Sequence, residues 1–343
     1  MSSSGRPGFG EPGPSSFGAR EGRAVAARRV RVGFFYALGA YLIWGGLPLY
    51  FLFLAPTGAF EIVAWRVIFS LVFCALIITV VRGWPAFLAV FRQPRLILMM
   101  GLAGALIYVN WQTYVLSVVS GHVVEASLGY FINPVITILL GVFVLRETLR
   151  PLQWAALVLS TVAVVVLALG YGAVPWIALI LAFSFGLYGL VKKHVGPKID
   201  AVNGLTLESL WLVPVVVIQL CVVGATTGLT FGQVNSWHTI AMVGAGVITA
   251  VPLLLFASAT KRLPLIVVGF VQYLTPIIQF VIGVVVLREP MPPERLAGFV
   301  IVWLSLVFLS VDVTLSSRSQ RRRNALQIAN DLPMAHTENT FET

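Results

Sequence analysis

Charged residues are scarce in this sequence. Asp, Glu, Lys and Arg together make up 10% of its 343 residues, whereas hydrophobic residues make up 58%. An ordinary soluble domain contains about 25% charged residues, so the composition excludes that class and indicates a membrane protein. Most of the net charge of +10 lies in the terminal segments and short loops, which is typical of a membrane topology signal and disfavours a nucleic-acid partner.

Cysteines and catalytic motifs are also few or absent. The two cysteines, Cys74 and Cys221, lie in apolar runs without CxxC spacing or a nearby histidine cluster, so we expect free thiols and no metal site. The sequence has no GxxxxGK[ST] loop, which disfavours ATP-driven transport. It also lacks HExxH, GxSxG and clustered Asp motifs, which disfavours an enzyme, and we expect no cofactor.

Long apolar runs fill most of the chain. A helix needs about 20 apolar residues to cross a hydrocarbon core of about 30 Å, and an open sheet would leave backbone groups unpaired in lipid. Ten runs reach or nearly reach that length: 33–54, 61–81, 96–118, 123–145, 151–170, 174–191, 204–224, 238–260, 264–287 and 294–313. The sequence therefore predicts an all-α integral membrane protein with ten transmembrane helices.

The two ends of the chain differ from these runs. Residues 1–32 are rich in Gly, Ser, Pro and Arg, and residues 314–343 are mostly polar, so we expect both segments to be disordered tails. With a cytoplasmic N-terminus, every Lys and Arg falls on the inner side except Arg66, within a helix, and Arg288 and Arg295, outside. Because positive residues concentrate on the cytoplasmic side, the sequence predicts that both termini are cytoplasmic.

An internal repeat relates the two halves of the chain. Residues 126–147 (ASLGYFINPVITILLGVFVLRE) align without a gap with residues 268–289 (VGFVQYLTPIIQFVIGVVVLRE), and Pro134 falls on Pro276. The offset covers five predicted helices, an odd number, so 33–170 and 174–313 are expected to be two inverted five-helix repeats. The Arg-Glu pair that closes each copy falls at a membrane surface and is expected to set a helix end.

The motifs along these runs resemble a known family. The repeated segment resembles the EamA domains of the drug/metabolite transporter superfamily. Other segments of the chain resemble the RarD subfamily of this superfamily. They are GAYLIWGGLPLYF (39–51), VNWQTY (109–114), GHVVEASLGYFINP (121–134), FGLYGLVKK (185–193), GLTLESLWLVP (204–214) and ITAVPLLLFASATKRLPL (248–265). The resemblance implies a ten-helix permease of the bacterial plasma membrane, with members named for an association with chloramphenicol sensitivity, and it supplies no substrate. Family members often have His-Arg in the second helix, whereas here Trp65 precedes Arg66, which excludes a proton relay through that histidine.

Three ionisable residues, Arg66, Glu125 and Glu208, fall inside predicted helices. Each costs about 2.5–3.5 kcal/mol at mid-bilayer on insertion scales, so each needs a partner or a function. Arg66 and Glu208 occupy the same repeat position with opposite charges, and they either line a central cavity or form ion pairs that fix helix packing. Glu125 begins the most strongly repeated helix and has the uncharged Val267 as its counterpart, which favours a role in the solute or proton pathway.

Neutral polar residues cluster in the third, fourth and ninth predicted helices. The candidates for the solute pathway are Asn110, Tyr130, Asn133, Gln272 and Tyr273. They either form hydrogen bonds between helices, worth about 0.6 kcal/mol each, or line a polar and aromatic cavity where the repeats meet. Their concentration on symmetry-related helices favours the cavity.

Prolines and aromatic residues lie in or near the same regions. Pro48, Pro134 and Pro276 each remove a backbone hydrogen bond, so we expect them to distort their helices and free carbonyl groups. The aromatic rings of Trp44, Trp111, Tyr130 and Tyr273 suit stacking on a planar or cationic solute, although Trp at a helix end also serves as an interface anchor.

These features favour a secondary-active transporter of a small organic metabolite or drug-like solute. The inverted repeats would alternate access to a central site, driven by a proton or by exchange with a second solute. The alternatives are a membrane scaffold or regulator that does not transport, and an integral-membrane enzyme that modifies lipid. The expected partners are the solute, membrane lipid and a proton or counter-solute, and the sequence leaves a homodimer open.

Overall fold

The computed structural model describes residues 15–119, 123–171 and 176–282, with the single residues 285, 300 and 304. Side chains are described within these ranges except at 15–24, 52, 118–128, 163, 166–171 and 280. The predicted tenth helix, 294–313, the tail 314–343 and residues 1–14 therefore lie outside the described residues, apart from residues 300 and 304.

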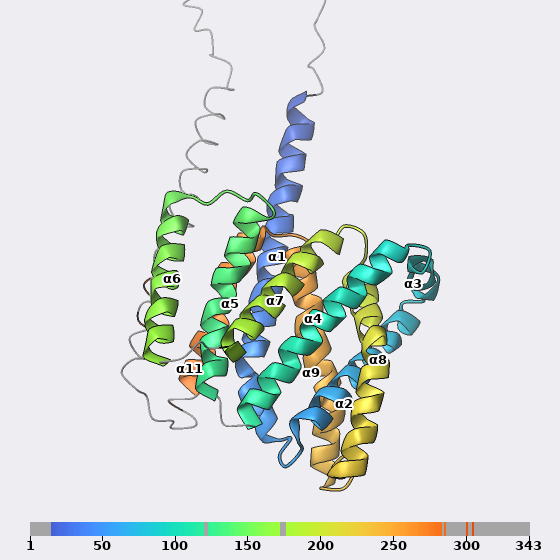
Figure 1. Cartoon of the computed structure of the whole chain (residues 1–343). Helices are drawn as coiled ribbons and strands as arrows, with labels where there is room; N and C mark the ends of the chain where they lie inside the picture. The colour runs from blue at the N-terminus through green and yellow to red at the C-terminus, as the bar shows by residue number, and fades with distance from the viewer. Residues whose placement is uncertain are drawn as a thin grey trace, which may run out of the picture.

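Helices joined by short turns make up the described chain, which contains no strand (Figure 1). They are α1 (Ser15–Leu52), α2 (Ala59–Val80), α3 (Trp84–Val90), α4 (Pro94–Val119), α5 (Val123–Phe143), α6 (Pro151–Tyr171), α7 (Trp176–Val195), α8 (Ala201–Thr226), α9 (Ser236–Thr260), α10 (Leu265–Gln272) and α11 (Leu274–Val281). Six of them, α1, α2, α4, α7, α8 and α9, contain described segments long and apolar enough to cross a membrane. The prediction of an all-helical membrane protein is confirmed over this part of the chain.

The first helix begins earlier than predicted. Residues 15–32 were assigned to a disordered tail, but α1 starts at Ser15, and Figure 1 shows its first turns projecting beyond the other helices. The prediction weighted the Gly, Ser and Pro of the first residues, whereas the stretch before residue 32 is rich in Ala and Arg, which are strong helix formers. The structure therefore has helix over residues 15–32, where the sequence predicts a disordered tail.

The predicted ninth helix, 264–287, is broken. The structure divides it at Tyr273 into α10 and α11, and the amide of Tyr273 bonds to the carbonyl of Phe270 at 3.3 Å instead of one residue further back. Pro276 explains the position, because its nitrogen cannot donate to the carbonyl of Gln272 and its ring clashes there. Helices α1 and α5 instead continue through Pro48 and Pro134.

The contacts between helices of the two halves come in pairs that the sequence repeat relates. Under the sequence repeat, α1 corresponds to α7, α2 to α8, α4 to α9, and α5 to α10–α11. Each contact between the halves has a counterpart in which both helices are replaced by their repeat equivalents. Thus α5–α7 corresponds to α10–α11 with α1, α4–α7 to α9–α1, and α2–α9 to α8–α4. The contacts of α2 with α8 and of α5 with α10–α11 are unchanged when the two halves are exchanged. This pattern is the one that a pseudo-two-fold axis between the halves produces.

Two repeat-related glycines let α4 and α9 approach the backbones of α8 and α2 closely. A Cβ atom on Gly104 would lie 3.0 Å from the carbonyl oxygen of Glu208, and one on Gly246 would lie 2.4 Å from the backbone of Phe69. The two glycines are separated by the repeat offset, as are Pro134 and Pro276. Small residues let helix backbones approach closely in lipid, so both crossings depend on the absence of a side chain.

Glu147, from the first copy of the repeated Arg-Glu pair, sets a helix end. Its carboxylate accepts hydrogen bonds from the backbone amides of Leu265 at 2.8 Å and Ile266 at 2.9 Å, the first two residues of α10. The first amides of a helix have no partner within it and attract negative charge. The expectation that this pair sets a helix end is confirmed for Glu147, whereas Glu289 lies outside the described residues.

Candidate functional site

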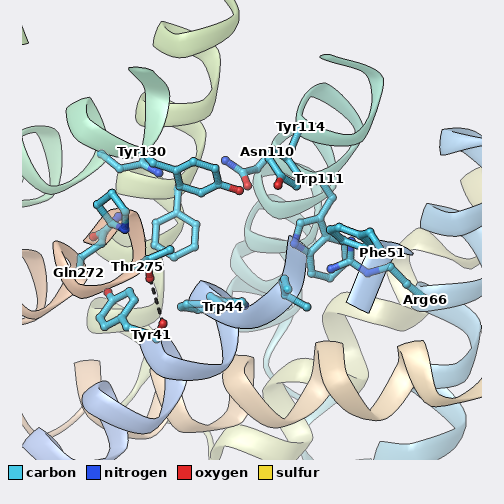
Figure 2. A pocket seen from close by; sticks show the side chains of 14 residues that line it. Tyr41, Trp44, Phe51, Arg66, Asn110, Trp111, Tyr114, Tyr130, Gln272 and Thr275 are labelled. Atoms are coloured by element: carbon cyan, nitrogen blue, oxygen red, sulfur yellow. Dashed lines mark hydrogen bonds between the residues drawn. The ribbon is translucent and has the colours of Figure 1, made fainter. Parts of the chain in front are cut away.

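A pocket lies between the two halves, at the level where α10 gives way to α11. It has a volume of about 60 Å³ and is lined by Tyr41, Trp44, Leu47, Phe51, Arg66, Asn110, Trp111, Tyr114, Tyr130, Asn133, Phe185, Gln272, Thr275 and Pro276. Figure 2 shows Arg66 beside Trp111 and Phe51 at one end, Tyr41 and Gln272 at the other, and Trp44 between them. Helices from both repeats therefore contribute to one polar and aromatic site.

Most of the predicted pathway residues meet in this pocket. Arg66, Asn110, Tyr130, Asn133 and Gln272 line it, as do the predicted aromatic residues Trp44 and Trp111. Two other predicted residues, Glu208 and Tyr273, do not line it: Tyr273 is buried in an apolar cluster with Phe131 and Val135. Glu125 lies in α5, and its side chain falls outside the described residues.

Arg66 is buried, and no described residue provides a counter-ion. Only 3% of its surface is exposed, its Nε donates to Thr249 Oγ1 at 2.8 Å, and its guanidinium carbon lies 4.9 Å from the Trp111 ring centroid and 5.6 Å from that of Phe51. Arg66 makes no ion pair with any residue that the structure describes. Sequence reasoning missed Thr249, since its repeat counterpart is the apolar Ile107 and the symmetry gives no signal there.

Hydrogen bonds between helices hold several lining residues in place. The Asn110 amide donates to the carbonyl of Leu181 at 2.9 Å and to Ser184 Oγ at 3.1 Å, so it ties α4 to α7. Thr275 Oγ1 donates to the carbonyl of Tyr41 at 3.1 Å, the contact drawn in Figure 2, and so ties α11 to α1. These bonds fix the pocket wall on both sides of the interface between repeats.

Two polar atoms of the pocket lack a partner. The hydroxyl of Tyr41 and Oδ1 of Asn133 are buried and make no hydrogen bond with the described residues. The residues themselves are 1% and 3% exposed. Because buried polar groups are normally paired, water or a bound molecule is expected to supply the missing partners.

Glu208 has a different role from that of its repeat counterpart, Arg66. Its carboxylate forms an ion pair with Lys192 at 2.5 Å and accepts a hydrogen bond from the Tyr188 hydroxyl at 3.2 Å. The two charged side chains are 1% and 4% exposed. Of the alternatives for Glu208, the structure shows the ion pair that fixes packing. Lys192 directly follows the predicted helix 174–191, and in the structure it lies in the last turns of α7.

A second polar cluster, named here the loop cluster, joins the halves near the start of α2 and consists of Thr57, Glu61, Thr230 and His238. Glu61 accepts from the amide and hydroxyl of Thr230 at 3.0 Å. The Thr230 and Thr57 hydroxyls are 2.6 Å apart, and Thr57 Oγ1 lies 2.7 Å from Nε2 of the buried His238. The cluster ties the α1–α2 turn to the α8–α9 loop. Glu61 is the first residue of the predicted helix 61–81, and the sequence has no signal for its partners.

Comparison with known proteins agrees with this architecture. Residues 31–169 and 173–311 each match the EamA-like transporter family. The chain is 43% identical over 298 residues to Protein RarD of Streptomyces exfoliatus, covering 87% of this chain and 94% of that protein. It is 36% identical over 292 residues to Protein RarD of Escherichia coli strain K12, covering 85% and 98%. A solved crystal structure superimposes with a TM-score of 0.58 at 15% identity over 80% of this chain and 97% of that one, which shows the fold alone.

Proposed function

We propose that this chain, which belongs to the EamA-like transporter family, is a secondary-active carrier that moves a small organic solute through the pocket between its two repeats. The observation that carries the proposal is the pocket itself, because residues from both repeats line it and five of them are polar residues expected inside the membrane. Carriers built from inverted repeats bind their solute at such an interface.

Contacts at the two ends of the bundle support alternating access. At one end, Glu147 of the first repeat binds the start of α10, and Arg29 donates to the carbonyl of Lys261. At the other end, the loop cluster and the hydrogen bond from Tyr50 to the carbonyl of Ala241 join the same two halves. Each set crosses between repeats, so opening the pocket to one side requires one set to separate while the other holds.

The remaining features of the proposal follow from the sequence. We infer two inverted five-helix repeats, ten transmembrane helices, cytoplasmic termini and a place in the bacterial plasma membrane. The exchanged helix contacts support the inverted arrangement. Coupling to a proton or to a counter-solute supplies the driving force, and Glu125 is the carboxylate proposed for the proton pathway.

Reconstitution tests the proposal. A metabolite library is screened for solutes that raise the Tm of the purified protein, and each positive solute is then tested for uptake into proteoliposomes. We expect at least one solute to stabilise the protein and to be carried. A protein that binds no solute, or binds one without carrying it, would support a scaffold or regulator instead.

A pocket variant with a matched control completes the test. Thr275→Phe places a ring in the pocket, because Thr275 is 4% exposed and lines it. Thr226→Phe makes the same change at an exposed position at the end of α8. We expect loss of uptake in the first variant and full uptake in the second. Equal uptake in both would contradict transport through this pocket.

A further inference from the structure

We propose that the solute is a small organic anion and that Arg66 binds its acid group. This inference rests on the proposed carrier function and names the substrate class of the same pocket. Arg66 is the one charged side chain among the lining residues, and no carboxylate of the described chain lines the pocket with it. An anion would supply the counter-charge that the described protein does not.

The contacts of Arg66 leave most of its binding capacity unused. A guanidinium carries five N–H donors in a planar fork that matches a carboxylate, and only the Nε donor is bonded to a described residue, Thr249. The ring faces of Trp111 and Phe51 offset part of the desolvation of the charge, but they accept no directed hydrogen bond. The terminal nitrogens are therefore available for a bidentate acid group.

Arg66 differs from the buried Lys192 and Glu208, which form an ion pair with each other. Lys192 and Glu208 are buried to a similar degree and neutralise each other at 2.5 Å. A buried charge without a partner is unfavourable, and an anionic ligand would supply that partner to Arg66. Arg66 and Glu208 share one repeat position, yet of the two only Arg66 lines this pocket.

The rest of the pocket defines the remainder of the solute. Trp44 and Tyr130 offer flat apolar faces, and the Tyr41 hydroxyl and Asn133 Oδ1 offer one donor and one acceptor. Figure 2 places Tyr41 at the end of the pocket away from Arg66. The volume of about 60 Å³ holds an acid group but is well below that of a cavity of about 150 Å³ that binds benzene. A planar solute must therefore enter as the two repeats separate.

Three isosteric probes isolate the charge. Benzoate, benzamide and benzamidinium share one planar shape and are respectively anionic, neutral and cationic. The Tm of the purified full-length protein is measured with each at equal concentration and constant ionic strength, with acetate and acetamide as a smaller pair. We expect benzoate to raise the Tm by a few degrees and the neutral and cationic probes to have no effect. Stabilisation by benzamide or benzamidinium as large as that by benzoate would overturn the inference.

Variants assign the effect to one residue. Arg66→Gln should abolish stabilisation by benzoate, and Arg66→Lys should retain part of it, because Lys keeps the charge without the planar fork. Arg262→Gln is the control: Arg262 also has a ring contact, to Tyr36 at 5.1 Å, and a backbone hydrogen bond, to Ser258 at 2.8 Å, but it lies outside the pocket. This control should keep the full benzoate response.

The outcomes separate this inference from the carrier function. If the library screen yields carried solutes that are all neutral or cationic, the protein is a carrier and the assignment of an anion is wrong. If Arg66→Gln responds to benzoate as the unmodified protein does, Arg66 is not the anion site. If carried solutes are anions and their uptake is lost in Arg66→Gln but kept in Arg262→Gln, the inference holds. Because the probe comparison needs no variant, poor folding of Arg66→Gln cannot hide a negative result.

Discussion

Arg66 and Glu208 show how the same repeat position can serve two purposes. Both lie on equivalent turns of α2 and α8, the helices that pack on each other across the pseudo-two-fold axis. Arg66 faces the pocket, whereas Glu208 is paired with Lys192 and hydrogen-bonded by Tyr188. One residue is thus available to a ligand, and the other stabilises the contact between α7 and α8.

The Lys192–Glu208 pair predicts a specific pattern of stability. Glu208→Gln leaves the Lys192 ammonium buried without its counter-charge and should lower stability by about 3–5 kcal/mol, as for other broken buried ion pairs. The double variant Lys192→Met/Glu208→Leu removes both charges and should regain most of that loss. Thermal unfolding of the purified variants measures both effects. A Glu208→Gln variant with an unchanged Tm would show that the pair contributes nothing.

Glu125 is the residue expected to couple solute uptake to proton movement. Its position at the start of the repeated helix, without a charged repeat counterpart, supports a place in the proton pathway. Glu125→Gln should lower uptake into proteoliposomes and flatten its dependence on pH. Thr275→Phe, which blocks the pocket, is the comparison, because it should lower uptake at every pH alike. Uptake by Glu125→Gln that matches the unmodified protein across the pH range would remove Glu125 from the mechanism.

The sequence predicted pocket residues where they follow the repeat. Tyr130 and Gln272 are repeat equivalents, and both line the pocket. The roles of Thr249 and Lys192 could not be predicted in this way, because each depends on which side chain of a neighbouring helix it contacts. The repeat offset pairs Thr249 with an apolar residue, and helix contacts across the interface have no local signature in the sequence.

At the scale of the helix, the break between α10 and α11 matters most. It precedes Pro276 by less than one turn and places Gln272 and Thr275 on either side of the interruption, where both line the pocket. Interrupted helices at membrane depth occur where the chain lines a cavity or is buried in protein. The sequence showed the proline but not whether the helix would bend or break, since α5 continues through the equivalent Pro134.

The contact of Glu147 with the start of α10 is expected to contribute to the stability of the protein. Glu147→Gln removes the negative charge that receives the amides of Leu265 and Ile266 and should lower stability by about 1.5–3 kcal/mol. Arg146→Gln is the matched control, because Arg146 is the exposed neighbour in the same motif and should change stability little. Thermal unfolding of the two variants measures the difference. Equal Tm values would show that the carboxylate does not hold the helix end.

For the whole molecule, the central point is that the pocket lies on the interface between two repeats with exchanged helix contacts. Hydrogen bonds between the repeats occur at both ends, through Glu147 at one and the loop cluster at the other. The positions of the six long apolar helices followed well from hydropathy, because lipid imposes their length. The hydrogen bonds at the two ends could not be predicted from hydropathy, since they join residues that are distant in the sequence.

Accessibility of the pocket from the two membrane faces tests the account most directly. A single cysteine is introduced as Thr275→Cys after Cys74 and Cys221 are replaced, and a small membrane-impermeant methanethiosulfonate is applied to right-side-out and to inside-out vesicles. The account predicts modification from both faces, slowed in each case by a carried solute. Modification from one face only, or from neither, would contradict a pocket that alternates between the two sides of the membrane.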